Sequence, residues 1–249
     1  MKFIFAENDR GITMITSGLL ALGGIIAGIM GGLLGIGGGI LLIPILRFGV
    51  GLEPAYAAGT CIVAVFFTTL GGGFKHFRLG HIDLRSILPV IIAGIVSTLL
   101  FSFVFIYITK KDFFLDTATG IVFSFLALRM VFEGLRDYQN NISEINTKEG
   151  IRGSVLSKLS VGGVAGIFPG LLGIGTGAIL VPAFAFVLNA PIKIAVGSSL
   201  ACFSLYALVS SVIKISQGFV KLNVLIPVCI GTLIGSQLGA ALNLSLIHI

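Results

Sequence analysis

The chain has 249 residues, of which 56% are hydrophobic and only 10% are charged, and its mean hydropathy is +1.10. A soluble domain carries roughly 25% charged residues, so this composition excludes an ordinary soluble protein. The net charge of +6 comes from lysines and arginines between apolar runs, where such charges report membrane orientation rather than nucleic-acid binding.

Long uncharged runs follow one another along the chain, and about 20 apolar residues suffice to span a bilayer as a helix. These runs cover residues 11–46, 54–74, 86–109, 159–192, 194–213 and 222–247. A further stretch, 113–132, is interrupted by Asp116 and Arg129, which we expect near the membrane interfaces. The sequence therefore predicts an all-α, polytopic helical membrane protein with about seven spans.

The first run contains the segment GGLLGIGGGILLIP, residues 31–44. As one continuous helix, the run 11–46 would be roughly 50 Å long at 1.5 Å per residue, which is too long for one simple crossing. We expect a helix break followed by a short helix. The glycines of this break are Gly35, Gly37, Gly38 and Gly39.

The same segment recurs 138 residues later as PGLLGIGTGAILVP, residues 169–182. Glycines and prolines stay in register without a gap, which shared hydrophobicity alone does not produce. The matched pairs include Gly35/Gly173, Gly37/Gly175, Gly39/Gly177, Pro44/Pro182, Gly59/Gly197, Gly80/Gly218 and Pro89/Pro227. The sequence thus indicates a duplication, with a first repeat over 1–135, a polar linker over 136–153 and a second repeat over 154–249.

A helix N-terminus presents unpaired N–H groups and a partial positive charge, so it binds anions without a buried cation. Two facing breaks would therefore hold an oxyanion near the middle of the membrane. In the second copy the break residues are Gly173, Gly175, Thr176 and Gly177. Close helix packing is the alternative explanation of such small residues in lipid.

Polar residues on the span after each break extend this hypothesis. Thr60 matches Ser198, which lies beside Ser199, and their hydroxyls would either bind the ligand or bond within their own helices. At the far end of that span His76 matches Lys214, and Lys75 is adjacent to His76. We expect these three to attract an anion at a vestibule, to couple protons through His76, or to anchor the interface.

The repeats have two possible orientations. One crossing per run gives four spans per repeat and parallel repeats, with positive charges placing the N-terminus, the 75–85 loop, the linker and the 214–221 loop in the cytoplasm. A short helix that turns back instead gives an odd number of crossings and inverted repeats, a recurring transporter design. The fourth span of the first repeat has no counterpart before residue 249. We therefore expect the second repeat to be truncated by one span.

Residue patterns that the sequence lacks restrict the possible substrates and activities. All ten acidic residues lie at or beyond predicted span ends, whereas cation pumps and proton relays usually use intramembrane carboxylates. Arg129 and Glu133, four residues apart, are expected to form an interfacial ion pair. The three cysteines fall inside apolar runs without metal or disulfide spacing, and the nucleotide-binding motifs are incomplete. We expect an anion as substrate, no cofactor, no metal and no enzymatic activity.

The paired glycine segments, the A-x-G-T/S span starts and the loop FKHFRLGHIDL together resemble the sulfite exporter TauE/SafE family. The resemblance covers residues 23–241. It implies a secondary transporter of small sulfur-containing anions such as sulfite, thiosulfate or sulfonates, normally built on about eight spans. It points to the glycine breaks and to Thr60 and Ser198 as the substrate site.

The sequence therefore predicts an inner-membrane permease for a small oxyanion working by alternating access, with the lipid bilayer and the anion as partners, and a homo-oligomer as an option. A passive anion channel and a non-transporting membrane assembly subunit are the alternatives. Valine at Gly37 or Gly175 is expected to abolish transport in a protein that still folds.

Overall fold

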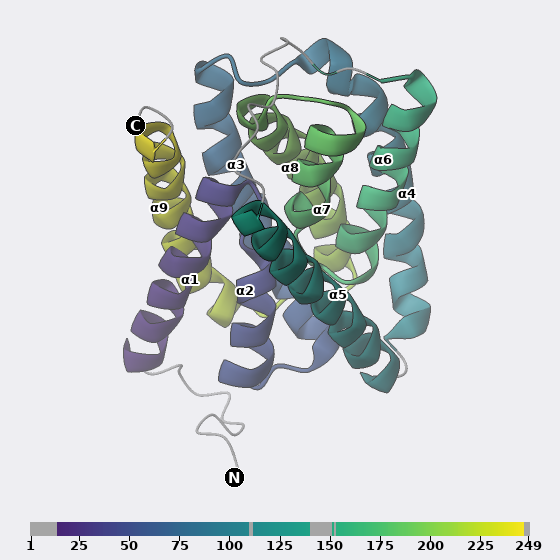
Figure 1. The fold of residues 1–249 in the computed structure, drawn as a ribbon. Coiled ribbons are helices and arrows are strands. Elements are labelled where there is room, and N and C mark those ends of the chain that lie inside the picture. The colour runs from purple at the N-terminus through teal and green to yellow at the C-terminus, as the bar shows by residue number, and fades with distance from the viewer. Residues whose placement is uncertain (1–13, 110–111, 140–150, 152, 247–249) are drawn as a thin grey trace.

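The structure, a computed structural model, describes residues 14–109, 112–139, 151 and 153–246, and every regular element in these ranges is helical (Figure 1). The first half contains α1 (Met14–Leu34), α2 (Gly39–Pro44), the π-helical segment η1 (Ile45–Gly49), α3 (Pro54–Arg78), α4 (Leu84–Ile108) and α5 (Asp112–Gln139). The second half contains α6 (Val155–Leu171), α7 (Gly177–Pro182), the π-helical segment η2 (Ala183–Val187), α8 (Ile192–Ser216) and α9 (Leu222–Leu246). This shared order, down to the short helix and its π-helical continuation, is what a duplication predicts.

The two long runs with glycine segments are broken helices. α1 ends at Leu34, and the chain turns back inside the molecule before the short helix α2 begins at Gly39 (Figure 1). α6 and α7 are separated in the same way. Neither run is one long helix.

Two helix pairs between the halves run parallel, with glycines at the contact. A Cβ added on α1 would meet the α9 backbone, and one added on α6 would meet the α4 backbone. The contacts advance in step: Gly24 with Val228, Gly28 with Thr232, Gly32 with Ser236; Gly162 with Val90, Gly166 with Gly94, Gly170 with Thr98. Small residues let these backbones approach closely, as is common between helices in lipid.

α3 and α8 run antiparallel through the centre of the molecule. Gly59, near the start of α3, lies against Phe219, just beyond the end of α8, and Gly197, near the start of α8, lies against His81, just beyond α3. Both helices are largely buried, whereas α4 exposes most of its surface. Its exposed stripe of apolar side chains, including Leu88, Ile92, Val96 and Phe103, faces outward as a lipid-facing surface requires.

These directions invert the second half relative to the first. α1 and α3 point the same way, α6 and α8 point the opposite way, and α4 and α9 are opposed likewise (Figure 1). The parallel arrangement with four spans per repeat is therefore wrong, because each short helix returns to the side it came from. The helix directions agree with the other alternative, in which the second half is inverted relative to the first.

The inversion also moves the charged loops. The loop after α3 and the loop after α8 lie at opposite ends of the molecule rather than on one side. The described cations at the first end are Lys75, Arg78, Arg85, Lys158 and Lys193, and those at the second are Arg47, Lys214 and Lys221. Among the described residues, the first end therefore carries the larger number of cations, the feature that the positive-inside rule associates with the cytoplasmic side.

Five described helices are long and apolar enough to cross a membrane: Thr16–Leu34, Pro54–Arg78, Leu84–Ile108, Ile192–Ser216 and Leu222–Leu242. The sequence predicted about seven spans because it also included two further segments. One is 113–132, which lies within the longer, less apolar α5, and the other is the broken run 159–192. Most of the predicted linker falls outside the described residues, and α5 itself extends to Gln139.

The inverted arrangement predicts that two positions matched by the repeat lie on opposite sides of the membrane. Arg78 and Ser216, related by the 138-residue offset, are both exposed, at the last residues of α3 and α8. Single cysteines at these positions, in a chain whose three native cysteines are replaced by alanine or serine, should differ in labelling by a membrane-impermeant maleimide on intact cells. We expect Ser216→Cys to react and Arg78→Cys to react only after cell lysis. Equal labelling of both on intact cells would restore the parallel arrangement.

Candidate functional site

The first break is held open by glycines in left-handed backbone conformation. Gly35, Gly37 and Gly38 have φ angles of 72°, 75° and 74°, which residues with a Cβ rarely adopt. Gly38 is the N-cap of α2, and since it has no side chain it cannot accept a capping hydrogen bond from the first N–H groups of the helix. The sequence therefore needs glycine at these positions to end α1 and restart the chain as α2.

The second break reaches a similar course with different backbone angles. Gly173 has a φ of 66°, but the N-cap of α7 is Thr176, whose φ of −88° is right-handed. This difference explains why the second copy reads GTG where the first reads GGG. It also brings a hydroxyl group to the break that the first copy lacks.

The two breaks touch through their backbones. A Cβ on Gly39 would lie 2.6 Å from the amide nitrogen of Gly175. A Cβ on Gly175 would meet the carbonyl oxygen of Ile36, and one on Gly177 would meet the carbonyl oxygen of Gly35. The starts of α2 and α7 therefore lie side by side, and only residues without side chains fit between them.

Side chains of α3 and α8 hold this contact from both sides. Ser199 Oγ donates to the carbonyl oxygen of Gly35 at 3.0 Å, and Cys61 Sγ lies 3.7 Å from that of Gly39. The Phe203 ring packs against Gly37 and Gly175. Ser199 is thus joined to the first break as a structural donor, with its hydroxyl proton already used.

The structure separates the other predicted hydroxyls. Thr176 lies at the second break, fully buried, and its Oγ1 has no hydrogen-bond partner. Thr60 lies near the start of α3, where its Oγ1 accepts the N–H of Lys221 at 3.1 Å. Ser198, near the start of α8, is buried with an unpartnered Oγ. Because α3 and α8 are antiparallel, Thr60 and Ser198 lie towards opposite ends and do not meet.

The predicted cations also lie at opposite ends. His76 is 1% exposed, and its Nδ1 is 3.4 Å from Nδ1 of His81. Burial and the nearby charge of Lys193 lower the pKa of His81. Lys75 is half-buried. Lys214 is fully buried at the end of α8, with its Nζ over the ring of Phe105.

The sequence did not reveal the role of Arg129. From α5 its Nη1 donates to the carbonyl oxygen of Ala178 at 3.3 Å, in the first turn of α7. A guanidinium therefore lies beside the second break. The predicted pairing with Glu133 concerns a side chain outside the described part of the chain. Sequence spacing alone gives no signal for Arg129 at α7, because the contact depends on how α5 crosses the molecule (Figure 1).

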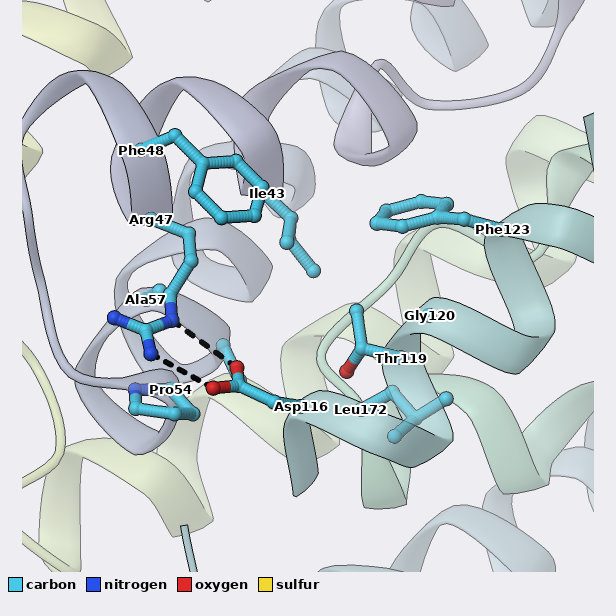
Figure 2. A pocket seen from close by; sticks show the side chains of 11 residues that line it. Ile43, Arg47, Phe48, Pro54, Ala57, Asp116, Thr119, Gly120, Phe123 and Leu172 are labelled. Atoms are coloured by element: carbon cyan, nitrogen blue, oxygen red, sulfur yellow. Dashed lines mark hydrogen bonds and ion pairs between the residues drawn. The ribbon is translucent and has the colours of Figure 1, made fainter. Parts of the chain in front are cut away.

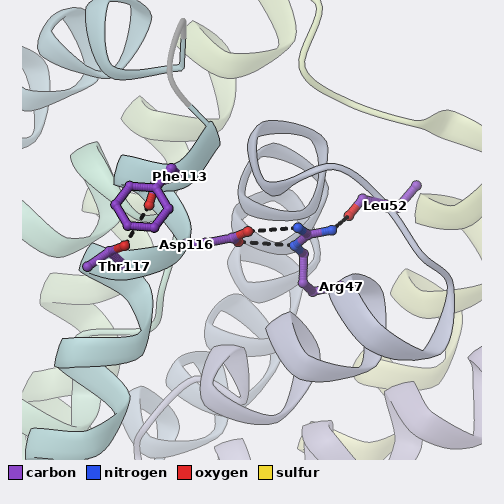
Figure 3. Close-up of polar contacts among 5 residues, drawn as sticks. All are labelled: Arg47, Leu52, Phe113, Asp116 and Thr117. Carbon is purple, nitrogen blue, oxygen red and sulfur yellow. Dashed lines mark hydrogen bonds and ion pairs between the residues drawn. The ribbon is translucent and has the colours of Figure 1, made fainter.

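An ion pair joins α5 to the end of η1. Arg47 donates to Asp116 through Nε at 3.1 Å and Nη2 at 2.7 Å, and its Nη1 donates to the carbonyl oxygen of Leu52 at 2.9 Å (Figure 3). Beside it, Thr117 donates to the Phe113 carbonyl within α5 (Figure 3). The bidentate geometry fixes the start of α5 against η1, next to the loop that leads into α3.

A cavity of about 340 Å³ lies behind this ion pair (Figure 2). Arg47 and Asp116 line one end, and Ala58 and Leu172 line another part, next to Gly173. Most of its wall is apolar, from Ile43, Phe48 and Phe123 among others. The cavity thus extends from the Arg47–Asp116 ion pair to Leu172 and Ala58, which adjoin the second break.

Comparison with known proteins identifies similar chains. A family model described as Sulfite exporter TauE/SafE matches residues 20–246. A probable membrane transporter protein, YunE of Bacillus subtilis, is 27% identical over 90% of this chain and 88% of its own length. A probable membrane transporter protein of Haemophilus influenzae is 30% identical over 74% of this chain and 68% of its own length.

A plant protein named Sulfite exporter TauE/SafE family protein 2, from Arabidopsis thaliana, is 39% identical over 27% of this chain and 15% of its own length. No solved structure matches this chain.

The contact between the breaks predicts an unequal response to two alanines. Gly177→Ala places a methyl group against the backbone of Gly35 and Ile36, and such overpacking costs about 1–3 kcal/mol. Gly163→Ala, in the middle of α6, meets nothing within 4 Å and is the matched control, expected to be neutral or stabilising by up to about 1 kcal/mol. Thermal unfolding in detergent would measure both. Equal melting temperatures would refute the close contact.

Valine at Gly37 or Gly175 is less informative than the sequence suggested. Gly37 has a φ of 75°, and a Cβ at Gly175 would strike the carbonyl oxygen of Ile36. Either valine disturbs the packing of the breaks themselves. A loss of transport in those variants would therefore not separate substrate binding from folding.

Proposed function

The chain belongs to the sulfite exporter TauE/SafE family and is a multi-pass membrane transporter, and we propose that its substrate is a small sulfur oxyanion of the sulfite or sulfonate class. The anion binds where the two glycine breaks meet and crosses by alternating access. One observation carries the proposal: the N-terminal ends of α2 and α7 meet in the interior, and no side chain caps either of them.

Uncapped helix starts favour an anion. The first N–H groups of each helix lack intrahelical acceptors, and in lipid every unsatisfied backbone group costs several kcal/mol. An oxyanion accepts several such hydrogen bonds at once and is favoured by both helix dipoles. Thr176, whose buried Oγ1 is unpartnered, adds a hydroxyl donor at the same break.

Arg129 supports a negative ligand by its position. Arg129 reaches the first turn of α7 through Ala178. A guanidinium next to the break supplies fixed N–H donors for an oxyanion bound there.

The inverted halves suit alternating access. Halves related by inversion can exchange conformations, so that a site between them opens first to one side and then to the other. The cavity from Arg47 to Leu172 supplies a route from one end towards the second break (Figure 2). In this scheme movement of α5 widens the route.

Removing the hydroxyl of Thr176 tests the site. Thr176→Val keeps the shape of the side chain but deletes one hydrogen bond to a charged ligand, worth about 1.5–3 kcal/mol, so the KM for sulfite should rise about 10- to 100-fold. Uptake of radiolabelled sulfite into proteoliposomes measures this change. Thr68→Val is the matched control, because Thr68 Oγ1 bonds only to Ala64 of its own helix. Equal kinetics for wild type and Thr176→Val would rule out this residue as a ligand.

Binding specificity tests the substrate class. A ligand at 100 times its Kd stabilises a protein by about 2.7 kcal/mol, which a thermal melt resolves. We expect sulfite, thiosulfate or a sulfonate to raise the melting temperature of the purified chain more than chloride or phosphate does, and Thr176→Val to reduce that rise. A larger effect of phosphate would contradict the sulfur-oxyanion assignment, and transport that never saturates would favour a passive channel.

A further inference from the structure

A second group of buried polar atoms lies between α4 and α8, away from the glycine breaks. Lys214 is fully buried, and its Nζ has no hydrogen-bond partner. Around it, three further buried polar atoms are also without partners: Ser102 Oγ, Ser211 Oγ and Gln217 Oε1. Such a concentration of unsatisfied groups in one helix interface is expensive unless something binds there.

Contacts between the two helices bring Gln217 and Lys214 of α8 against Ser102 and Phe105 of α4. Gln217 Nε2 donates to the carbonyl oxygen of Ser102 at 3.2 Å. Lys214 Nζ lies 3.0 Å from the ring centroid of Phe105. Ser102 and Phe105 are three residues apart on α4, and on α8 Lys214 lies three residues from Ser211 and three from Gln217, so Lys214 neighbours both on the helix surface.

The charge of Lys214 has no counterion in the described structure. No carboxylate among the described residues forms an ion pair with it, and the one described pair near this end joins Arg47 to Asp116. The face of an aromatic ring offsets part of the cost of burying an ammonium, but an anion offsets far more. Intramembrane cations of this kind mark ion pathways more often than structural positions.

An aromatic cover closes the group from the nearest end. The Phe105 ring meets Phe219 edge to face at 5.4 Å, and Phe219 in turn meets Tyr56 at 6.0 Å. Phe219 belongs to the loop between α8 and α9, which Thr60 ties down through the N–H of Lys221. This loop therefore covers the side of Phe105 next to Lys214.

We propose that Lys214, Ser102 and Ser211 form a second binding site for a small oxyanion, distinct from the glycine breaks. The ammonium supplies charge and donors, and the two hydroxyls donate to oxygen atoms of the ligand. Gln217 Oε1 accepts from the ammonium or from a protonated oxygen, as in hydrogen sulfite. That this anion is the transported substrate on its way to or from the breaks rests on the proposed function, whereas the binding itself does not.

Sulfite binding to the purified full chain tests the second site. Calorimetric titration of wild type should give two sulfite ions per chain, and Lys214→Met should give one, at unchanged affinity for the remaining ion. Lys221→Met is the matched control, since Lys221 is an exposed lysine at the same end that lies over Tyr56. It should retain two. Two ions bound by Lys214→Met would overturn the proposal.

A second variant guards against misfolding, and a third separates the two proposals. Ser211→Ala removes one hydroxyl without changing charge and should weaken one of the two binding events about tenfold. Unchanged binding in this variant would also count against the site.

Thr176→Val should weaken the other binding event. If wild type binds one ion, lost only in Thr176→Val, the second site is refuted and the break site stands. If that ion is lost only in Lys214→Met, the break site fails instead.

Discussion

The backbone contact between the two glycine breaks is the constraint on which the rest of the structure depends. Gly39 and Gly175 meet with room for no side chain, and Gly177 lies against the backbone of Gly35. Each half of the chain turns back inside the molecule at its break, and the contact sets the two helix starts side by side. Their amides and dipoles create a positively polarised point in an apolar interior, and an anion is the ligand that such a point favours.

Inversion of the halves follows from the same turn and decides where the charges lie. His76 and Lys214 occupy equivalent places in the two halves, yet the antiparallel course of α3 and α8 puts them at opposite ends. Each is buried with an unpartnered nitrogen. A pathway between the two ends would therefore pass a polar group before and after the breaks, which matches the needs of an ion that must shed and regain water.

The sequence predicted the helical membrane fold and the position of both breaks, because glycine and proline act locally on backbone geometry. It left the orientation of the repeats open, since whether a short helix continues or returns is decided by tertiary contacts such as that of Gly39 with Gly175. The contact of Thr60 also depends on tertiary structure, because its Oγ1 accepts the N–H of Lys221 from the loop after α8. Arg129 could not be placed at α7 without knowing how α5 crosses the fold.

The most direct test of the central claim is to locate a heavy-atom analogue of sulfite in crystals of the protein. Selenite has the shape and charge of sulfite, and selenium gives an anomalous signal that marks its position. The account predicts an anomalous peak at the starts of α2 and α7, within hydrogen-bonding distance of Thr176 Oγ1. Well-ordered crystals with bound selenite elsewhere but none at the breaks would contradict it, and the paired glycines would then serve helix packing alone.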